Sequence, residues 1–173
     1  MGKFLLLYMY ITVFFSSLHA YESENKLEVV IIGKVAKFIT WKEKNNTENF
    51  VITVLNNPYG SLFDETFSQK QIKNKNIVLK YIDNIDELQD TNILYIPVSK
   101  ANELEDILRK VKSKNILTIS SIRGFAEKQG IMQIYFVLQK VKLKINLDIA
   151  KSDDLQINAS LLSIADVIKG NSQ

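Results

Sequence analysis

The chain has 173 residues, a formal net charge of +3 and 46% hydrophobic residues, a balance suited to one domain stabilised by its own core. Cysteine is absent and the single histidine is His19, which excludes disulfides, cysteine nucleophiles, Ser-His-Asp triads, histidine bases and most zinc or copper sites beyond residue 20. Lysines alternate with carboxylates and no basic stretch carries interleaved glycines, so nucleic-acid binding is not expected.

The first 20 residues are typical of a secretory signal peptide. Lys3 supplies a basic start, Phe4–Phe15 is an apolar run too short to span a bilayer, and small residues precede a cleavage point after Ala20. A retained N-terminal membrane anchor is the alternative. We therefore expect residues 1–20 to be removed and residues 21–173, which contain no linker or repeat, to form one exported domain.

Leu27–Trp41 is predicted to be a helix, because apolar side chains recur in it at helical spacing. Further apolar residues widen its surface beyond one stripe, so it should be buried on two sides or contact a partner. Trp41, the single tryptophan, either packs against the sheet or anchors that partner. The candidate partner-binding residues are Ile31, Val35, Phe38 and Trp41.

Short strands and helices alternate through the middle of the chain. The predicted strands are Phe50–Leu55, Ile77–Ile82, Ile93–Val98 and Ile116–Ser120. The predicted helices are a short one around Leu62, Phe63 and Phe67, and Lys100–Lys112 with Ser99 as its N-cap. This alternation favours βαβ units, and hence a mainly parallel sheet with helices on both faces.

After Ser120 the pattern predicts an antiparallel hairpin. Its strands are Ile131–Leu138 and Val141–Leu147, and the connection between them is too short for a crossover. The connection lacks the Asn-Gly pair typical of such turns, so its turn type is open. A helical turn at Asp148–Asp154 and a closing helix at Ser160–Lys169 are expected to follow. The side chains expected to face inward from that last helix are Leu161, Ile164, Ala165 and Ile168.

Two polar segments are candidate sites. Arg123-Gly124-Phe125 follows a strand expected to be central, where open α/β sheets bind ligands, so Arg123 could hold a carboxylate or phosphate and Phe125 could stack on it. The alternative is a solvated arginine beside a core phenylalanine. The acidic residues between 148 and 154 lack the spacing of a calcium loop and are interpreted as capping and surface charge. No catalytic residue, cofactor or metal is therefore predicted.

Several of these segments occur in the order typical of a known family. They are Ile31–Trp41, Ile52–Gly60, Ile93–Ile96, Ile116–Ser120 with Gly124-Phe125-Ala126 and Gly130-Ile131-Met132, Leu143–Leu147 and Leu161–Ala165. Together they resemble the YfiR-like periplasmic proteins, also known as the DUF4154 family, over about Val30 to Ile168. The chain departs from the family pattern at Lys42, Asn56 and Gln129, and it lacks the cysteine pairs of the best-known members. Redox switching is therefore not carried over.

The resemblance implies a non-enzymatic periplasmic regulator. Such proteins bind and repress the sensor domain of an inner-membrane diguanylate cyclase, and so control cyclic-di-GMP and biofilm formation. An outer-membrane lipoprotein that relieves the repression is a second implied partner, and the regulator could form a homodimer. The alternative is a periplasmic sensing module that binds a small anionic or aromatic metabolite through Arg123 and Phe125. An enzyme that uses only carboxylates or lysines finds no support in the residue spacing.

Overall fold

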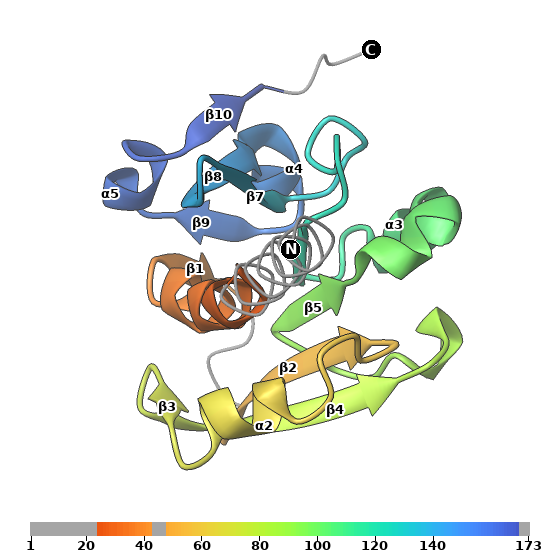
Figure 1. Ribbon diagram of the computed structural model, residues 1–173. Helices are drawn as coiled ribbons and strands as arrows, with labels where there is room; N and C mark the ends of the chain where they lie inside the picture. The colour runs from red at the N-terminus through yellow and green to blue at the C-terminus, as the bar shows by residue number, and fades with distance from the viewer. Residues whose placement is uncertain (1–23, 43–47, 170–173) are drawn as a thin grey trace, which may run out of the picture.

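The computed structural model describes residues 24–42 and 48–169, and its centre is a curled, mainly parallel sheet of eight strands (Figure 1). The strands are β1 (Ile39–Trp41), β2 (Asn49–Leu55), β3 (Gln71–Ile72), β4 (Lys75–Ile82), β5 (Ile93–Ile96), β6 (Leu117–Ser120), β7 (Met132–Val137), β8 (Lys140–Asn146), β9 (Leu155–Ile157) and β10 (Asp166–Ile168). The helices are an N-terminal helix described over 24–36, α2 (Leu62–Phe67), α3 (Leu104–Val111), α4 (Leu147–Ser152) and α5 (Ala159–Leu162), with 3₁₀ turns η1 (Ile85–Glu87) and η2 (Val98–Glu103).

The large sheet has the order β10-β8-β7-β6-β5-β2-β4-β3, while β1 and β9 form a separate antiparallel pair. From β2 the chain passes through α2 to β4 on one side, and it then returns to β5 on the other side. The carboxyl ends of β2 and β5 therefore mark a point where the strand order reverses, the place where open α/β sheets bind ligands.

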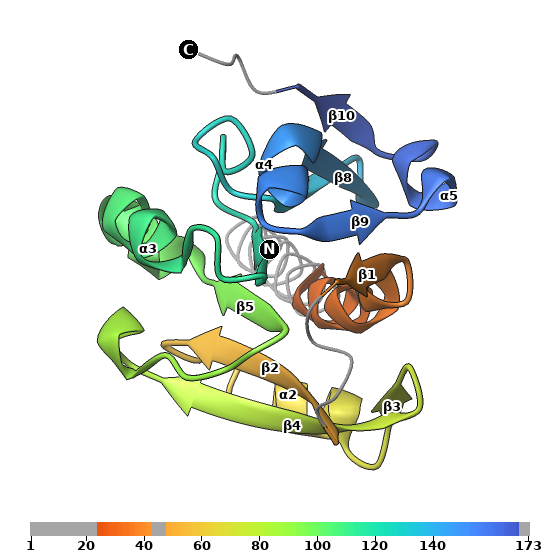
Figure 2. The ribbon, with the colours of Figure 1, turned by 180° about the vertical axis from the view of Figure 1, so that it is seen from behind.

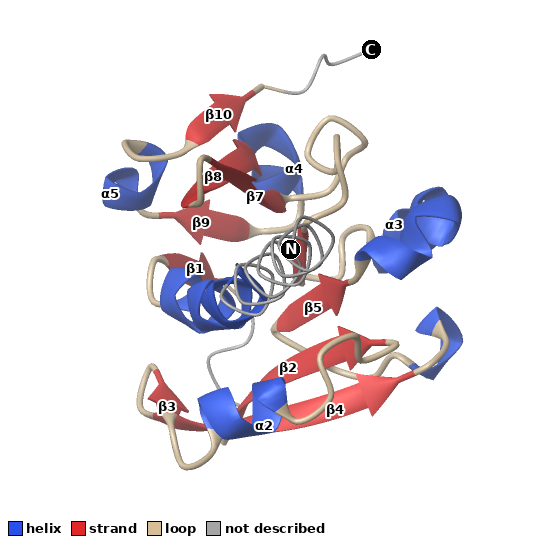
Figure 3. Cartoon of the chain, in the orientation of Figure 1, coloured by secondary structure: helices blue, strands red, loops and turns tan. Residues whose placement is uncertain are grey.

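Apolar side chains cover both faces of the central strands. On β5, Ile93 and Tyr95 join the cluster beneath the N-terminal helix and α2, whereas Leu94 and Ile96 join the cluster beneath α3. Burial on both faces explains why this strand is a continuous apolar run rather than an alternating one. The predicted fold class, with helices on both faces of a mainly parallel sheet, is confirmed (Figure 3).

The predicted hairpin is also present. Strands β7 and β8 pair in antiparallel register, with Ile134 opposite Leu143 and Phe136 opposite Val141. Two residues, Leu138 and Gln139, connect them. Helix α4 follows β8 directly and is capped by Asn146, whose side chain accepts a hydrogen bond from the backbone N–H of Ile149 at 3.1 Å.

The prediction of one helix over Leu27–Trp41 is wrong at its C-terminal end. The helix ends at residue 36, and Ile39–Trp41 forms β1, which pairs with β9. β-branched and aromatic residues suit a strand, and β9 supplies the hydrogen-bond partner from a distant part of the sequence. Strand β9 lies between α4 and β1 when the fold is seen from behind (Figure 2).

The closing helix predicted over Ser160–Lys169 is wrong beyond its first turn. After α5, residues Asp166–Ile168 form β10 and pair in parallel with β8. Pairing there satisfies the outer backbone groups of β8, which a helix could not do. Leu161 faces inward as expected, but Ile164 is 73% exposed.

Two further details differ from expectation. The segment predicted as helix Lys100–Lys112 begins as the 3₁₀ turn η2, whose N-cap is Pro97 rather than Ser99, before α3 starts at Leu104. Short strand β3 was not predicted and pairs with β4.

None of the helices in the described residues is long and apolar enough to cross a membrane. The predicted signal peptide, residues 1–20, lies outside the described residues.

Candidate functional site

A buried cluster of one carboxyl and two phenol groups lies at the C-terminal ends of the central strands. Glu28 on the N-terminal helix is 3% exposed and shares the inward stripe of Ile32 and Val35. The hydroxyl of Tyr95, on β5, donates to Glu28 Oε1 at 2.9 Å, and the hydroxyl of Tyr59, after β2, donates to Oε2 at 2.9 Å. The cluster therefore joins the N-terminal helix to the point where the strand order reverses.

The surroundings of Glu28 favour its protonated form. Burial raises the pKa of Glu28, the hydrogen bonds from Tyr59, Tyr95 and Ser121 oppose that rise, and the charge of Glu24 adds to it. Burial also raises the pKa of Tyr95, so this phenol stays a hydrogen-bond donor. The arrangement can bind a proton, and the carboxyl group is closed off from solvent.

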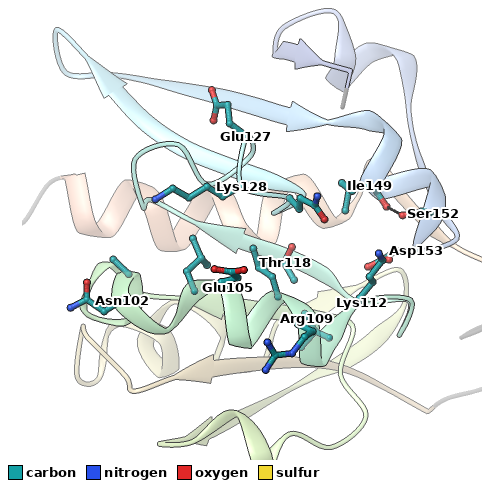
Figure 4. A pocket seen from close by; sticks show the side chains of 15 residues that line it. Asn102, Glu105, Arg109, Lys112, Thr118, Glu127, Lys128, Ile149, Ser152 and Asp153 are labelled. Atoms are coloured by element: carbon teal, nitrogen blue, oxygen red, sulfur yellow. Dashed lines mark hydrogen bonds between the residues drawn. The ribbon is translucent and has the colours of Figure 1, made fainter. Parts of the chain in front are cut away.

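A second candidate site is a cleft of about 650 Å³ between α3, α4 and the loop after β6 (Figure 4). This volume lies within the range of small-molecule sites. Its apolar lining comes from Leu104, Leu108, Val111 and Ile149. Its polar lining includes Glu105, Lys112, Thr118, Lys128 and Asp153.

Charges of both signs lie along this cleft. Asp153, which is 4% exposed, accepts a hydrogen bond from the backbone N–H of Ser113 at 2.9 Å. Burial raises the pKa of Asp153, and the charge of nearby Lys112 opposes the rise. At the other end in Figure 4, Lys128 makes no ion pair within the described part of the chain. A molecule with an apolar body and polar groups at its ends would complement such a lining.

The four residues predicted to bind a partner do not form one exposed surface. Val35 is 3% exposed and Trp41 is 4% exposed, and the Trp41 indole donates to the backbone oxygen of Asn92 at 3.1 Å. Ile31 is half-buried against the core, whereas Phe38 is 38% exposed. Partner binding through this set stays a prediction, and Phe38 is its most accessible member.

The predicted ligand-binding residues Arg123 and Phe125 lie in different surroundings. Arg123 is exposed, whereas Phe125 is completely buried in the core beneath α3. Gly130 lies so close to the Phe125 ring that a Cβ atom there would be 2.2 Å from Cε1. The ring is thus enclosed by protein, and ligand binding at Arg123 stays a prediction.

Two buried acids were not predicted as site residues. Asp153 was interpreted as capping and surface charge; it is the C-cap residue of α4, but the surface assignment is wrong, because it is buried in the cleft wall. Glu28 carried a usable signal, because it falls on the same helical stripe as apolar residues. Within residues 24–42 and 48–169, no group of three or more histidine, cysteine, aspartate or glutamate side chains is arranged to hold a metal ion.

Comparison with known proteins adds a family and a fold. The family model described as YfiR/HmsC-like (DUF4154) matches residues 25–166. None of the curated proteins matches the chain. Among solved structures, a conserved domain protein from Vibrio cholerae O1 biovar eltor strain N16961 is similar, with a TM-score of 0.60 and 13% sequence identity. The similarity covers 82% of this chain and 60% of that one, and it shows a shared fold alone.

Proposed function

Because the chain belongs to the YfiR/HmsC-like family, whose model matches residues 25–166, we propose that it represses an inner-membrane diguanylate cyclase by binding its periplasmic sensor domain. Members of this family are periplasmic regulators of cyclic-di-GMP signalling. The observation that carries the proposal is the extent of the match, which runs from the N-terminal helix to the first residue of β10. Loss of the protein would then raise cyclic-di-GMP and biofilm formation.

The proposal includes how the repression is relieved. An outer-membrane lipoprotein would compete for the regulator, and the regulator could act as a homodimer. Since the chain contains no cysteine, its repression should not respond to thiol reductants or oxidants. This sets it apart from a redox-controlled regulator.

The test combines binding with signalling. The exported protein is used to pull down the periplasmic sensor domains of the source bacterium's inner-membrane diguanylate cyclases, and cyclic-di-GMP is measured after deletion of its gene. We expect recovery of at least one such cyclase, and higher cyclic-di-GMP in the deletion strain with or without reductant. Recovery of none, together with an unchanged cyclic-di-GMP level, would overturn the proposal.

A second candidate function is the sensing of a small ligand, and the cleft beside α3 favours it. Thermal shift against free amino acids, short peptides and nucleoside monophosphates would detect binding, because a ligand that prefers the native state raises its melting temperature. The variants Lys112→Ala and Lys128→Ala should weaken the shift, since both lysines line the cleft. Lys114→Ala, an exposed lysine outside the lining, is the matched control. Equal shifts in all three variants would place the ligand elsewhere.

A further inference from the structure

The turn between β7 and β8 has a conformation that its residues do not favour. Leu138 has φ +49° and Gln139 has φ +62°, so both central residues of this two-residue turn are left-handed. Hairpins with this geometry favour Asn-Gly, because positive φ suits small or amide side chains and disfavours bulky ones. Leu138 is the one hydrocarbon side chain among the non-glycine residues with positive φ in the described ranges.

No packing within the described chain compensates for this conformation. Leu138 is 91% exposed, and Val137 beside it is 47% exposed. A leucine that is both in a disfavoured conformation and in water stabilises neither the turn nor the core. An observed backbone outlier of this kind points to a functional role, because such strain collects at binding and switching sites.

The tip of the hairpin is also cationic on one face. Val137 lies opposite Lys140 and Tyr135 lies opposite Lys142, so these four residues share the face turned away from the core. The other face carries Phe136 and Val141, which pack against the core.

The two lysines nearest the tip differ from the next one along β8. Lys144 is bound by Glu127 at 2.6 Å, whereas neither Lys140 nor Lys142 makes an ion pair within the part of the chain that the structure describes. Both are exposed. The tip therefore presents an exposed leucine beside two positive charges that no ion pair within the described residues neutralises.

We propose that this hairpin tip, defined as Val137, Leu138, Lys140 and Lys142, inserts into an apolar hollow rimmed by carboxylates on a protein partner. This inference rests on the proposed function, under which the partner is the sensor domain of the diguanylate cyclase. Leu138 fills the hollow, and the lysines steer and orient the encounter with the acidic rim. A protein suits the tip better than a bilayer, because two aliphatic side chains and two lysines offer little apolar surface for membrane anchoring.

The test uses a variant that separates binding from folding. Leu138→Asn/Gln139→Gly installs the residue pair that this turn favours, so the melting temperature should be equal or higher. Affinity for the sensor domain, measured by titration with the purified domain, should nevertheless fall by about tenfold or more, since the exposed leucine is lost. Ile164→Asn removes another largely exposed aliphatic side chain, 73% exposed and away from the hairpin tip, and should leave the affinity unchanged.

A charge-reversal variant and a vesicle-binding assay complete the experiment. Lys140→Glu/Lys142→Glu should slow association and reverse its dependence on salt. If the wild type binds and Leu138→Asn/Gln139→Gly binds equally well, the inference fails and the proposed function stands. If the wild type binds no sensor domain, both fail. Cosedimentation of the wild type, but not of this variant, with vesicles of phosphatidylglycerol and phosphatidylethanolamine would replace the protein partner by a membrane.

Discussion

Glu28 places a carboxyl group in the core with phenolic hydroxyls as its donors and no cation paired with it among the described residues. Removing a charge from water is costly unless it is paired or neutralised. Burial is the largest influence on the pKa of Glu28 and raises it, because it disfavours the charged carboxylate more than the hydrogen bonds from the tyrosines favour it. The hydrogen bonds between the N-terminal helix and the sheet are therefore made by a group whose charge depends on pH.

The first prediction concerns this dependence. The folded-state pKa of Glu28 lies above its ordinary value of 4.5, so its contribution to stability is full below that pH and is lost as pH rises through the folded pKa. Glu28→Gln keeps a neutral side chain at every pH, so its stability should not fall as pH rises in the way that the wild type's does. The free energy of unfolding of both proteins is measured in urea from acidic to mildly alkaline pH. As pH rises, the variant should become more stable relative to the wild type. A constant difference between the two proteins would contradict the assignment.

Asp153 shows how little residue identity reveals about a site. Its sequence neighbours suggest an exposed acidic turn, yet its carboxylate is buried beside the end of α3 and lines the cleft. Glu28 could have been recognised from its helical stripe, but Asp153 could not. Its burial depends on contacts with Ser113 and Asn115, which lie far away in the sequence.

At the scale of elements, the N-terminal helix and α2 meet at Gly33. A Cβ atom at this position would lie 2.5 Å from Cε1 of Phe67, which is 5% exposed and has little freedom to move. The close approach of these two elements thus requires a residue without a side chain. The gain in helix propensity from alanine, about 1 kcal/mol, opposes an overpacking cost of about 1–3 kcal/mol.

Gly33→Ala should therefore lower the free energy of unfolding by up to about 2 kcal/mol, as measured by urea denaturation. Lys34→Ala, an exposed neighbour on the same helix, is the control and should change it by less than about 0.5 kcal/mol. In a Phe67→Leu background Gly33→Ala should cost less than in the wild type, because the clash is with the ring. A Gly33→Ala protein that is more stable than the wild type would show that Phe67 can move aside.

The segment after α5 gives a test of strand against helix. Leu161 is 2% exposed and Ile164 is 73% exposed, although a continuous helix would have turned both inward. Leu161→Ala should cost about 2–5 kcal/mol of stability, whereas Ile164→Ala should cost less than about 0.5 kcal/mol. Equal losses in thermal or urea unfolding would favour the helix over β10.

At the scale of the whole molecule, Trp41 connects the small β1–β9 sheet to the large sheet through a hydrogen bond and a ring contact. Its indole donates to Asn92 just before β5, and its ring packs edge-to-face on Phe50 of β2 at a centroid distance of 5.3 Å. Residues of β1 and β9 belong to the same apolar cluster as the central strands. The two sheets should therefore unfold together.

Trp41 makes this prediction measurable, because it is the single tryptophan. Unfolding followed by its fluorescence should coincide with unfolding followed by far-ultraviolet circular dichroism, as expected for one cooperative transition. Phe50→Leu, which removes the ring partner, should shift both curves to lower denaturant by the same amount. A fluorescence change that precedes the loss of secondary structure would mean that the β1–β9 sheet detaches on its own.

The sequence by itself determined the central strands, the hairpin and the family, because each depends on local order. A continuous apolar run such as Ile93–Ile96 suits a strand buried on both faces, and the segments follow one another as in the YfiR/HmsC-like family. Only the tertiary structure decided that Ile39–Trp41 and Asp166–Ile168 are strands and that Asp153 is buried. Periodicity alone does not separate helix from strand in segments this short, and the choice depends on a hydrogen-bond partner that folding brings from a distant part of the sequence.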